Sequence, residues 1–337
     1  MTGTIAPEWD ERVLAAHSVP HFMQSRAWAS IRSGGPWQPA PLDLGAADRP
    51  MPVLAFTRTV AGVGALRHLP RISGLAPEDV PGLTAAVAAS ADGAFATKVE
   101  VYQPRDRALE QAFLDQGWRP TRASQYRYAV VVDLADGPEG ALARMKKRAR
   151  AEIRVGERNG VVVDRADVDG SDAEEMLGLV RATEERSGAF FRSDDYLRRV
   201  WAGFAAHGQG ALYLARHDGR VVSGAFVVTF GRSAWYKDGG SLRDAPQLMA
   251  SRLLHWRVMQ DLAAAGIDRY DLGHVPPPDT GHPAGRGLLI FKGAFAPDVT
   301  EYLPAFLLPH TPAAEAWRAG EAAFIADHRE RTGDYWY

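Results

Sequence analysis

The sequence contains no cysteine among its 337 residues. This absence excludes disulfide frameworks, zinc sites with thiolate ligands and cysteine nucleophiles. A strong excess of one charge is also missing, since 39 lysines and arginines are balanced by 41 aspartates and glutamates, for a formal net charge of −2. This balance argues against a dedicated, strongly basic nucleic-acid binder, but an average over the whole chain can hide a local basic patch.

Long apolar runs and targeting segments are absent as well. The N-terminal residues are acidic and are broken by Pro7, whereas a secretory signal needs a basic start followed by roughly 7–15 apolar residues. The Ala-rich stretch 84–96 is interrupted by Ser90, Asp92 and Gly93, so it falls short of the ~18 apolar residues of a spanning helix. We therefore expect a soluble, cytoplasmic protein without stable membrane insertion.

Several standard catalytic patterns are missing. The sequence has no Gly-x-Ser-x-Gly elbow, no His-Glu-x-x-His helix and no Walker loop, which removes the minimum parts of those hydrolase, zincin and P-loop sites. His274 and His282 share one loop but have no partner at helical metal spacing, so we expect no metal site. Residues 71–76 match the Arg-x-x-Gly-x-Ala pattern of acetyl-CoA loops, but Pro70 and Pro77 argue against a clean strand-loop-helix cradle.

What is present alternates between strand and helix patterns, which predicts a mixed α/β fold. The length suggests about two domains. Asp218-Gly219 lies between two β-rich segments and predicts a hairpin. The predicted strands are 53–57, 98–102, 126–134, 161–164, 211–216, 221–230 and 269–272, and the predicted helices are 107–116, 139–158, 172–185, 196–207 and 248–265.

A weak internal echo suggests that two similar α/β units are joined. The helix over 107–116 ends at Gly117 and is followed by a β-rich stretch, and the helix over 248–265 ends at Gly266 and leads into another strand. A helix, a glycine cap and a strand thus recur about 150 residues apart.

The most charged stretch lies between the two halves. Residues 144–158 contain seven basic side chains and only two acidic ones, while Leu142, Met145, Ala149 and Ile153 recur at the spacing of a core-facing helix. One interpretation is a solvated helix face. The other is a ridge that contacts the phosphates of a nucleic acid or of a nucleotide-linked substrate. The candidate phosphate-binding residues are Arg144, Lys146, Lys147, Arg148, Arg150 and Arg154.

The C-terminal third contains one lysine inside an apolar segment. Lys292 is flanked by Ile290, Phe291 and Phe295. An ammonium in such surroundings is costly to desolvate unless it meets an anion or a developing negative charge. The structural alternative is a lysine that reaches solvent from a strand edge, and the residues alone leave both interpretations open.

Together, several short blocks resemble the Fem family of aminoacyl-tRNA-dependent peptidyltransferases, which build peptidoglycan cross-bridges. Each block is weak, but they occur in the family's order from about residue 20 to 305. The length resembles compact, FemX-like members without the inserted coiled-coil arm. The blocks are Phe22-Met-Gln24-Ser25-x-x-Trp28, Leu69-Pro70-Arg71, Lys98-Val-Glu100, Lys146-Lys-Arg-Ala-Arg150, Thr183-Glu-Glu-Arg186, Tyr236 before Gly239-Gly-Ser241, Tyr270-Asp271-Leu-Gly273, and Phe291-Lys292 with Glu301-Tyr302.

The resemblance implies an α/β (α+β) fold of two tandem GNAT-like domains with mixed sheets. The first would span residues 1–140 and be completed by 312–337, and the second would span 141–311. Family members move an amino acid from its tRNA to an amine of a peptidoglycan stem peptide, on a nucleotide-linked or lipid-linked precursor. The implied partners are therefore aminoacyl-tRNA and a muropeptide precursor, with transient contact with the inner face of the membrane. We expect a monomer that uses aminoacyl-tRNA as co-substrate and needs no cofactor.

The resemblance also assigns roles to residues. Lys292 would stabilise negative charge at the transferring ester, and Phe291 would help to hold the tRNA end, so both are the expected catalytic residues. The six basic residues of 144–154 would bind tRNA phosphates. The expected substrate-binding residues are Arg32, Arg71, Lys98, Glu100, Tyr102, Arg186, Tyr236 and Asp238.

The sequence departs from the family around the expected acceptor groove. Phe190 stands where a compact member has tyrosine, Asp238 replaces a frequent aromatic residue, and His274 replaces a glycine. The acceptor is thus less securely assigned than the transfer. The alternatives are a tRNA-dependent ligase that tailors a small peptide metabolite, an acyl-CoA N-acyltransferase, and a non-catalytic GNAT-like binding module. Without cysteine there is no thioester route, so direct aminolysis is the simplest chemistry.

Overall fold

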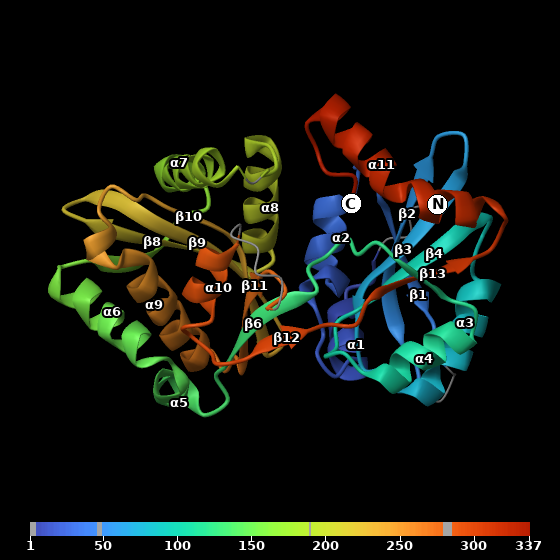
Figure 1. The fold of residues 1–337 in the computed structure, drawn as a ribbon, viewed down its shortest axis with the longest axis horizontal. Coiled ribbons are helices and arrows are strands. Elements are labelled where there is room, and N and C mark those ends of the chain that lie inside the picture. Colours follow the sequence, from blue (N-terminus) through green and yellow to red (C-terminus); the bar gives the residue numbers. More distant parts are fainter. Residues whose placement is uncertain (1–4, 46–48, 189, 279–284) are drawn as a thin grey trace. The chain divides into compact units, whose positions relative to one another are not determined.

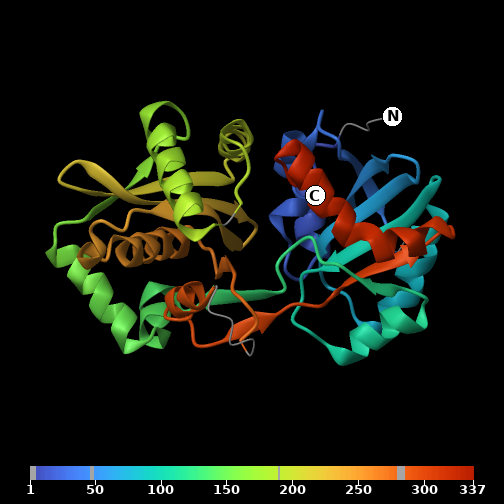
Figure 2. The ribbon, with the colours of Figure 1, turned by 45° about the horizontal axis from the view of Figure 1, so that its top comes forward.

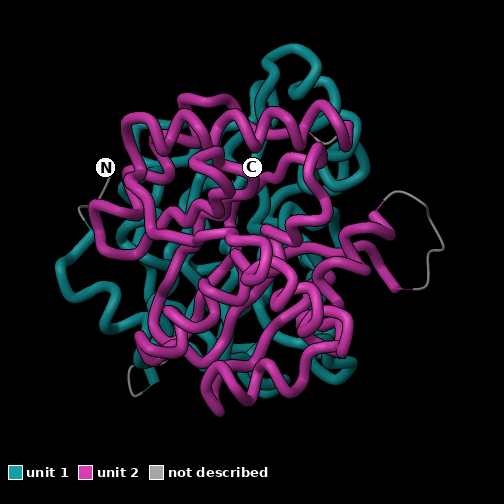
Figure 3. Tube along the Cα trace, turned by 90° about the vertical axis from the view of Figure 1, so that its left-hand side faces the viewer, with its two compact units in different colours: residues 1–127, 301–337 teal, residues 128–300 magenta. Residues whose placement is uncertain are grey.

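The computed structural model describes residues 5–45, 49–188, 190–278 and 285–337 (Figure 1). The chain forms two compact units. The first comprises residues 1–127 and 301–337, and the second comprises residues 128–300 (Figure 3). Each unit is built around one mixed sheet, with six strands in the first and seven in the second.

The unit boundaries lie earlier in the chain than the sequence placed them. The predicted limits at 140 and 311 fall after β6 (Tyr128–Asp133) and after β13 (Ala305–Pro309). The structure places β6 in the second sheet, between β11 and β12, and β13 in the first sheet, between β4 and β5. Each unit therefore receives an inner strand from a segment that the sequence had assigned to the other.

The first unit has the sheet order β1-β2-β3-β4-β13-β5. Val99 and Val101 of β4 point toward a core shared with α3 and α4, while Lys98 points to the opposite face and reaches Glu321 of α11. Figure 2 shows α11 in red along this sheet. The elements are α1 (Trp9–Ala16), α2 (Arg26–Arg32), β1 (Gln38–Asp43), β2 (Pro52–Val60), β3 (Gly64–Ile72), α3 (Val80–Ala89), β4 (Ala94–Val101), α4 (Arg107–Asp115), β5 (Arg119–Thr121), β13 and α11 (Ala313–Thr332).

The second unit has the sheet order β12-β6-β11-β10-β9-β8-β7. Its elements, besides β6, are α5 (Gly137–Arg144), α6 (Lys147–Arg158), β7 (Val162–Ala166), α7 (Gly170–Ser187), α8 (Asp194–Ala206), β8 (Gly210–His217), β9 (Arg220–Phe230), β10 (Ser233–Ser241), α9 (Ala250–Ala264), β11 (Arg269–His274), α10 (Arg286–Lys292) and β12 (Val299–Glu301), the last crossing the unit boundary by one residue.

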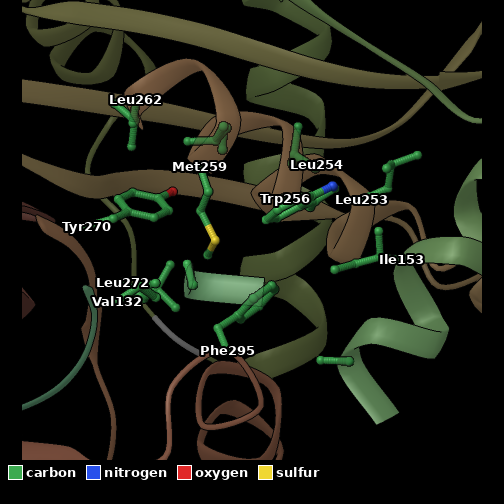
Figure 4. Close-up of a cluster of buried hydrophobic side chains, with 14 of the residues drawn as sticks. Val132, Ile153, Leu253, Leu254, Trp256, Met259, Leu262, Tyr270, Leu272 and Phe295 are labelled. Atoms are coloured by element: carbon green, nitrogen blue, oxygen red, sulfur yellow. The ribbon is translucent and has the colours of Figure 1, made fainter. Parts of the chain in front are cut away.

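The main core of the second unit lies between the sheet and α9. Figure 4 shows Met259 of α9 pointing toward Tyr270 and Leu272 of β11, and all three are fully buried. Helix α6 adds Ile153 to this cluster. Helices α7 and α8 contact β8, β9 and β10, and the close approach of α7 requires glycine at 240, where a Cβ would collide with the backbone of Leu179.

The two sheets share one topology. In each, a parallel pair of strands is flanked by antiparallel neighbours, and one helix connects the two parallel strands: α3 between β3 and β4, and α9 between β10 and β11. The predicted repeat of two α/β units is therefore present, but the sequence matched the wrong helix of the first unit with α9. The counterpart of α9 is α3, whereas the sequence had matched α9 with α4, because both end at a glycine with positive φ.

The predicted continuous helix over 139–158 is also wrong. Met145 is extended, with φ −65° and ψ 149°, and divides the segment into α5 and α6. The break is held by a tertiary bond from the Lys146 amide to the carbonyl of Ala294, 3.0 Å away. The Arg150 guanidinium caps the end of α5 by donating to the carbonyls of Ala143 and Met145. Met145, Ala149 and Ile153 are nevertheless buried, as their spacing predicts.

The predicted hairpin turn is confirmed. Asp218 and Gly219 have φ of 48° and 78° and form the turn between β8 and β9, as a tight hairpin requires. Among the described residues, no helix is both long and apolar enough to cross a membrane.

Candidate functional site

The site of greatest chemical interest lies where the parallel strands β10 and β11 stop pairing. Their register runs from Ser233–Arg269 to Trp235–Asp271. Beyond it, the β9–β10 register shifts between Tyr236 and Asp238, and the β11–β6 register shifts before His274. In open α/β sheets, ligands bind at the carboxyl ends of such strands.

We call this point, just beyond the last paired residues Trp235 and Asp271, the opening between β10 and β11. Lys292 is placed there by the last turn of α10. The residue is only 4% exposed, and its ammonium donates to the His274 carbonyl, 3.0 Å from Nζ. The Tyr236 ring lies 5.6 Å from Nζ. Gly273 has φ of +75°, and a Cβ there would stand 3.7 Å from Nζ. Lys292 therefore lies at a helix end and not at the strand edge of the structural alternative, and its ammonium contacts the end of β11.

Burial lowers the pKa of Lys292 to about 8, and the nearby Asp271 carboxylate limits the fall. Burial and the charge of Lys292 together lower the pKa of His255 to about 3 and that of His274 to about 4. Burial raises the pKa of Tyr236. Around this opening, the lysine is therefore the side chain whose charge changes just above neutral pH.

An aromatic cluster supports the lysine. His255 of α9 lies edge-on to the Tyr236 ring at 4.6 Å between centroids and contacts Phe291 and Phe295. Its Nδ1 lies 3.1 Å from the hydroxyl of Tyr270. The predicted pair Phe291 and Lys292 is thus packed against the core, with Tyr236 beside it.

Tyr236 and Asp238 were predicted to share a groove, but they point to opposite faces of the sheet. The bulge at Lys237 breaks the alternation that would place residues two apart on one face. Tyr236 meets α9, whereas Asp238 accepts a hydrogen bond from Trp201 of α8 at 2.9 Å and lies 3.3 Å from the ammonium of Lys237. Asp238 is thereby separated from the lysine site.

Arg186 lies near the end of α7. Its guanidinium donates to the Ser241 carbonyl at 2.9 Å and to the Thr183 hydroxyl at 3.3 Å. It is exposed and therefore available to a ligand. Gly239 lies two residues before Ser241. This position requires glycine because a Cβ at Gly239 would collide with the Tyr236 ring.

In the first unit, the sequence-predicted residues form a buried charged cluster. Arg71 has φ of 54° where β3 bulges away from β4. Its guanidinium donates to the Tyr126 carbonyl at 2.6 Å and lies 4.6 Å from that ring and 5.3 Å from the Tyr102 ring. Tyr102 is itself buried and stacks on Tyr302.

Glu100 lies in the same cluster and accepts bonds from the amides of Ser124 and Gln125 at 2.9 and 3.0 Å. Burial by itself would raise the pKa of Glu100, but the hydrogen bond and charge of His68, with the nearby cations Lys98 and Arg71, hold it well below its usual range. Such a carboxylate is a weak proton acceptor, so it can orient groups but is poorly suited to be a general base.

Two other predicted substrate-binding residues, Lys98 and Arg32, differ in how far they are exposed to solvent. Lys98 is fully buried, and its ammonium is paired with the Glu321 carboxylate at 2.8 Å. A substrate could reach Lys98 only if α11 moved, so we do not carry it into the proposed site. Arg32, at the end of α2, lies over the Trp28 ring at 5.5 Å and is partly exposed.

The six candidate phosphate-binding residues of 144–154 fall into two groups. Arg144 pairs with Asp136, Arg148 pairs with Glu152, and Arg150 caps α5. Among the described residues, no ion pair or side-chain hydrogen bond joins the other three to the chain, and all three are exposed: Lys146, Lys147 and Arg154.

The acetyl-CoA-like pattern lies in a strand-loop-helix connection after all, between β3 and α3. Its backbone amides are already bonded within the chain. The amide of Ser73 donates to His17, that of Leu75 to Gln103, and that of Ala76 to Asp79. A pyrophosphate loop needs amides that point at the ligand, and these point at side chains instead.

Metal ligands were not expected. No cluster of three or more histidine, aspartate or glutamate residues suited to hold a metal is present in the described ranges. His282, which the sequence placed in the same loop as His274, lies outside the described residues.

Comparisons with known proteins bear on the fold. Residues 143–283 match the family described as acetyltransferase (GNAT) domain. The UDP-N-acetylmuramoylpentapeptide-lysine N(6)-alanyltransferase of Weissella viridescens is 26% identical over 186 residues, which cover 53% of this chain and 52% of that protein. The match thus spans about half the length of this curated relative. A crystal structure of FemX has a TM-score of 0.78 at 16% identity and covers 93% of this chain and 97% of its own.

The chain is thus similar in sequence to this alanyltransferase over half of its length and has the fold of FemX. A tandem GNAT protein from the clavulanic acid biosynthesis pathway has a TM-score of 0.52 at 12% identity, covering 92% of this chain and 95% of its own. The predicted fold class is therefore confirmed: α/β (α+β), with two tandem GNAT-like domains and mixed sheets.

The sequence did not single out two residues that lie close to Lys292. Arg252 and His255 are both buried, and they share a face of α9 with Trp256 and Met259. The spacing i, i+3, i+4 and i+7 was visible in the sequence and indicates that a basic and an imidazole side chain occupy core positions. A polar residue at a core position of a helix is the signal that could have found them.

Proposed function

We propose that this chain is an aminoacyltransferase that moves an amino acid from aminoacyl-tRNA to an amine of a peptidoglycan-precursor stem peptide. The observation that carries the proposal is Lys292. A buried ammonium that is bound to one carbonyl and faces the opening between β10 and β11 can stabilise a negative charge that develops there.

The proposed reaction is direct aminolysis of the ester. The neutral acceptor amine attacks the ester carbonyl, and a carbon–nitrogen bond forms while the carbonyl oxygen becomes an oxyanion. The carbon–oxygen bond to the ribose then breaks, and the proton lost by the amine ends on the ribose hydroxyl. Lys292 supplies the cation for the oxyanion or for the leaving oxygen, and Phe291 supports the end of the tRNA. The ester is already activated, so positioning and charge stabilisation suffice.

The acceptor class is supported by the relative from Weissella viridescens, whose name specifies alanyl transfer to the lysine of a UDP-linked muramoyl pentapeptide. Arg186 and Arg32 are the candidate contacts for the phosphates and peptide of such a precursor, because both reach the surface. Arg71 and Glu100 support the first unit from within, since both are buried and bonded to its own loops.

The tRNA donor is supported by the exposed basic face of α6. Lys146, Lys147 and Arg154 offer three cations on one rigid helix, a pattern suited to phosphates. An acyl-CoA donor is less well supported, because three backbone amides of the loop after β3 already donate to side chains of the protein. The matching loop after β10, residues 242–249, contains no glycine.

The donor and acceptor are tested with purified protein, a set of charged tRNAs and a UDP-linked muramoyl pentapeptide. The product is identified by mass spectrometry, and ribonuclease treatment of the donor serves as the control. We expect one aminoacyl group on the stem peptide and at least a 10²-fold lower kcat for Lys292→Met. Transfer from acetyl-CoA instead, or an unchanged rate for the variant, would overturn the proposal.

The tRNA surface is tested by Lys146→Glu with Lys147→Glu. Both lie at the start of α6, where acidic residues favour the helix, so the fold should survive. We expect weaker tRNA use and a salt slope smaller by about one for each phosphate that α6 no longer neutralises. Arg107→Glu with Arg119→Glu makes the same charge change on exposed positions of the first unit. Equal effects of the two pairs would assign the weaker tRNA use to net charge and not to α6.

A further inference from the structure

Arg252 connects the basic helix to the lysine site. It lies in the first turns of α9, and its side chain is 8% exposed. Its Nε donates to Glu152 of α6 at 2.7 Å, and its Nη1 donates to the Phe291 carbonyl at 2.5 Å. The guanidinium carbon also lies 4.3 Å from the centroid of the Phe291 ring and 4.7 Å from that of Phe295.

These contacts hold both the backbone and the ring of the residue before Lys292. The Phe291 carbonyl belongs to the last turn of α10, where carbonyls lack a full set of helical partners. A bond to this carbonyl fixes the plane of the peptide that joins Phe291 to Lys292. The cation over the ring fixes the direction of Phe291. Together with the Ala294 amide, 3.3 Å from the same carbonyl, Arg252 thus holds the backbone from which the lysine side chain starts.

We propose that Arg252, oriented by Glu152, is a positioning residue that keeps the Lys292 ammonium at the opening between β10 and β11. The inference rests on the proposed function for its catalytic consequence. The effect of Arg252 on the position of the Lys292 ammonium can be measured without any tRNA.

Packing of α6 on α9 does not by itself explain a buried arginine. Ala149, Ile153 and Leu253 already form an apolar contact there, and a Cβ at Gly156 would stand 3.1 Å from Leu253. Replacing a buried ion pair by apolar residues often costs nothing or even stabilises. The contact that apolar residues cannot reproduce is the directed bond from Arg252 to the Phe291 carbonyl.

The chain contains a matched control for this ion pair. Arg257 of α9 pairs with Glu157 of α6 at 3.2 Å. The two pairs join the same helices and are separated by the same number of residues, but the second is exposed and reaches no residue of α10. Arg257→Met therefore removes one bridge between α6 and α9 and leaves the contact with Phe291 intact.

The first measurement follows Lys292 directly. The sequence has only five lysines, so a protein labelled with carbon-13 at the lysine Cε gives few signals, and Lys292→Met assigns the relevant one. The groups around the ammonium are Asp271 and His274 of β11, Tyr236 of β10 and His255 of α9. In the parent we expect titration near pH 8, and in Arg252→Met we expect the pKa to rise toward 10.5 as the side chain reaches water.

The second measurement separates positioning from binding. In the transfer assay we expect Arg252→Met to lower kcat by about 10²-fold, a decrease typical of a misplaced catalytic group, and to change KM for tRNA by less than about threefold. Arg252→Lys keeps one donor and should recover part of kcat. Glu152→Gln should act in the same direction but more weakly, and Arg257→Met should leave both constants near those of the parent.

The outcomes distinguish the two proposals. If the Lys292 titration and kcat are both unchanged in Arg252→Met, the positioning role is wrong. If Arg257→Met reproduces the effects, packing of α6 on α9 explains them and the role is again wrong. If the titration moves as expected but the parent accepts no charged tRNA, the positioning of Lys292 stands and the proposed function fails. Should Arg252→Met not fold, Arg252→Lys and Glu152→Gln test the same expectations.

Discussion

Replacing Lys292 by methionine should stabilise the folded protein at neutral pH while it abolishes transfer. Burial lowers the pKa of the ammonium from 10.5 to about 8. This difference corresponds to about 3 kcal/mol of unfavourable free energy when the buried side chain is charged. The variant also leaves the His274 carbonyl without its lysine donor, which costs about 1 kcal/mol. The expected net gain at pH 7 is therefore about 2 kcal/mol.

The sign of the pH dependence follows from linkage. Between pH 8 and 10.5 the unfolded chain binds more protons at this site than the folded chain, so the stability of the parent rises with pH. The cost of the charge is fully present below pH 8 and is relieved as the pH approaches 10.5. The methionine variant has no such group, so its advantage over the parent should disappear by about pH 10.

The assay is urea denaturation of both proteins at pH 7, 8, 9 and 10, with the difference in the free energy of unfolding plotted against pH. Every other titrating group is common to both proteins and cancels in the difference. A variant that is less stable than the parent at pH 7, or a difference that does not change with pH, would refute the reasoning. Either result would mean that the ammonium is better solvated or more strongly paired than its contacts indicate.

Three further changes test the fold around the sites. Lys98→Met leaves the buried Glu321 carboxylate without its cation and should lower the free energy of unfolding by about 3–5 kcal/mol, a decrease that adding Glu321→Gln should partly reverse in urea denaturation. Met259→Ala empties a fully buried position in the core of the second unit and should cost about 2–5 kcal/mol in the same assay. Gly273→Ala requires φ of +75° and should cost about 1 kcal/mol. Because its Cβ contacts the lysine ammonium, it should also lower kcat, whereas Gly117→Ala, with similar φ and open space, should leave kcat unchanged.

The sequence predicted elements well where the signal is local. Alternating apolar residues located the long strands, and Asp218-Gly219 located a turn, because each pattern is decided by neighbours along the chain. The break between α5 and α6 was not predictable in this way. It depends on a bond between the Lys146 amide and the Ala294 carbonyl, which are 148 residues apart, and no helix-breaking residue occurs at Met145.

In the candidate site, too, local signals were visible in the sequence and contacts between distant residues were not. Lys292 was identified because a charge within an apolar run is visible in one segment. Tyr236 and Asp238 were both expected at the acceptor groove because the resemblance places them there, but the bulge at Lys237 puts them on opposite faces of the sheet. Arg252 was missed because its importance lies in two contacts, with Glu152 and with Phe291, that are 100 and 39 residues away.

The duplicated topology also explains why one unit is favoured for chemistry. In both units the pairing of the parallel strands is irregular near a residue with positive φ: β3 bulges at Arg71 in the first unit, and the β10–β11 pairing ends shortly before Gly273 in the second. In the first, the charges near this point are the Arg71 guanidinium, which donates to the Tyr126 carbonyl, and the Glu100 carboxylate, which the amides of Ser124 and Gln125 already satisfy. In the second, the charge is the Lys292 ammonium, which has three hydrogens and donates one of them to a carbonyl. A saturated carboxylate stabilises a fold, whereas an ammonium with remaining donors can also stabilise an oxyanion. These corresponding points in the two sheets thus have different uses because the two units place different side chains beside them.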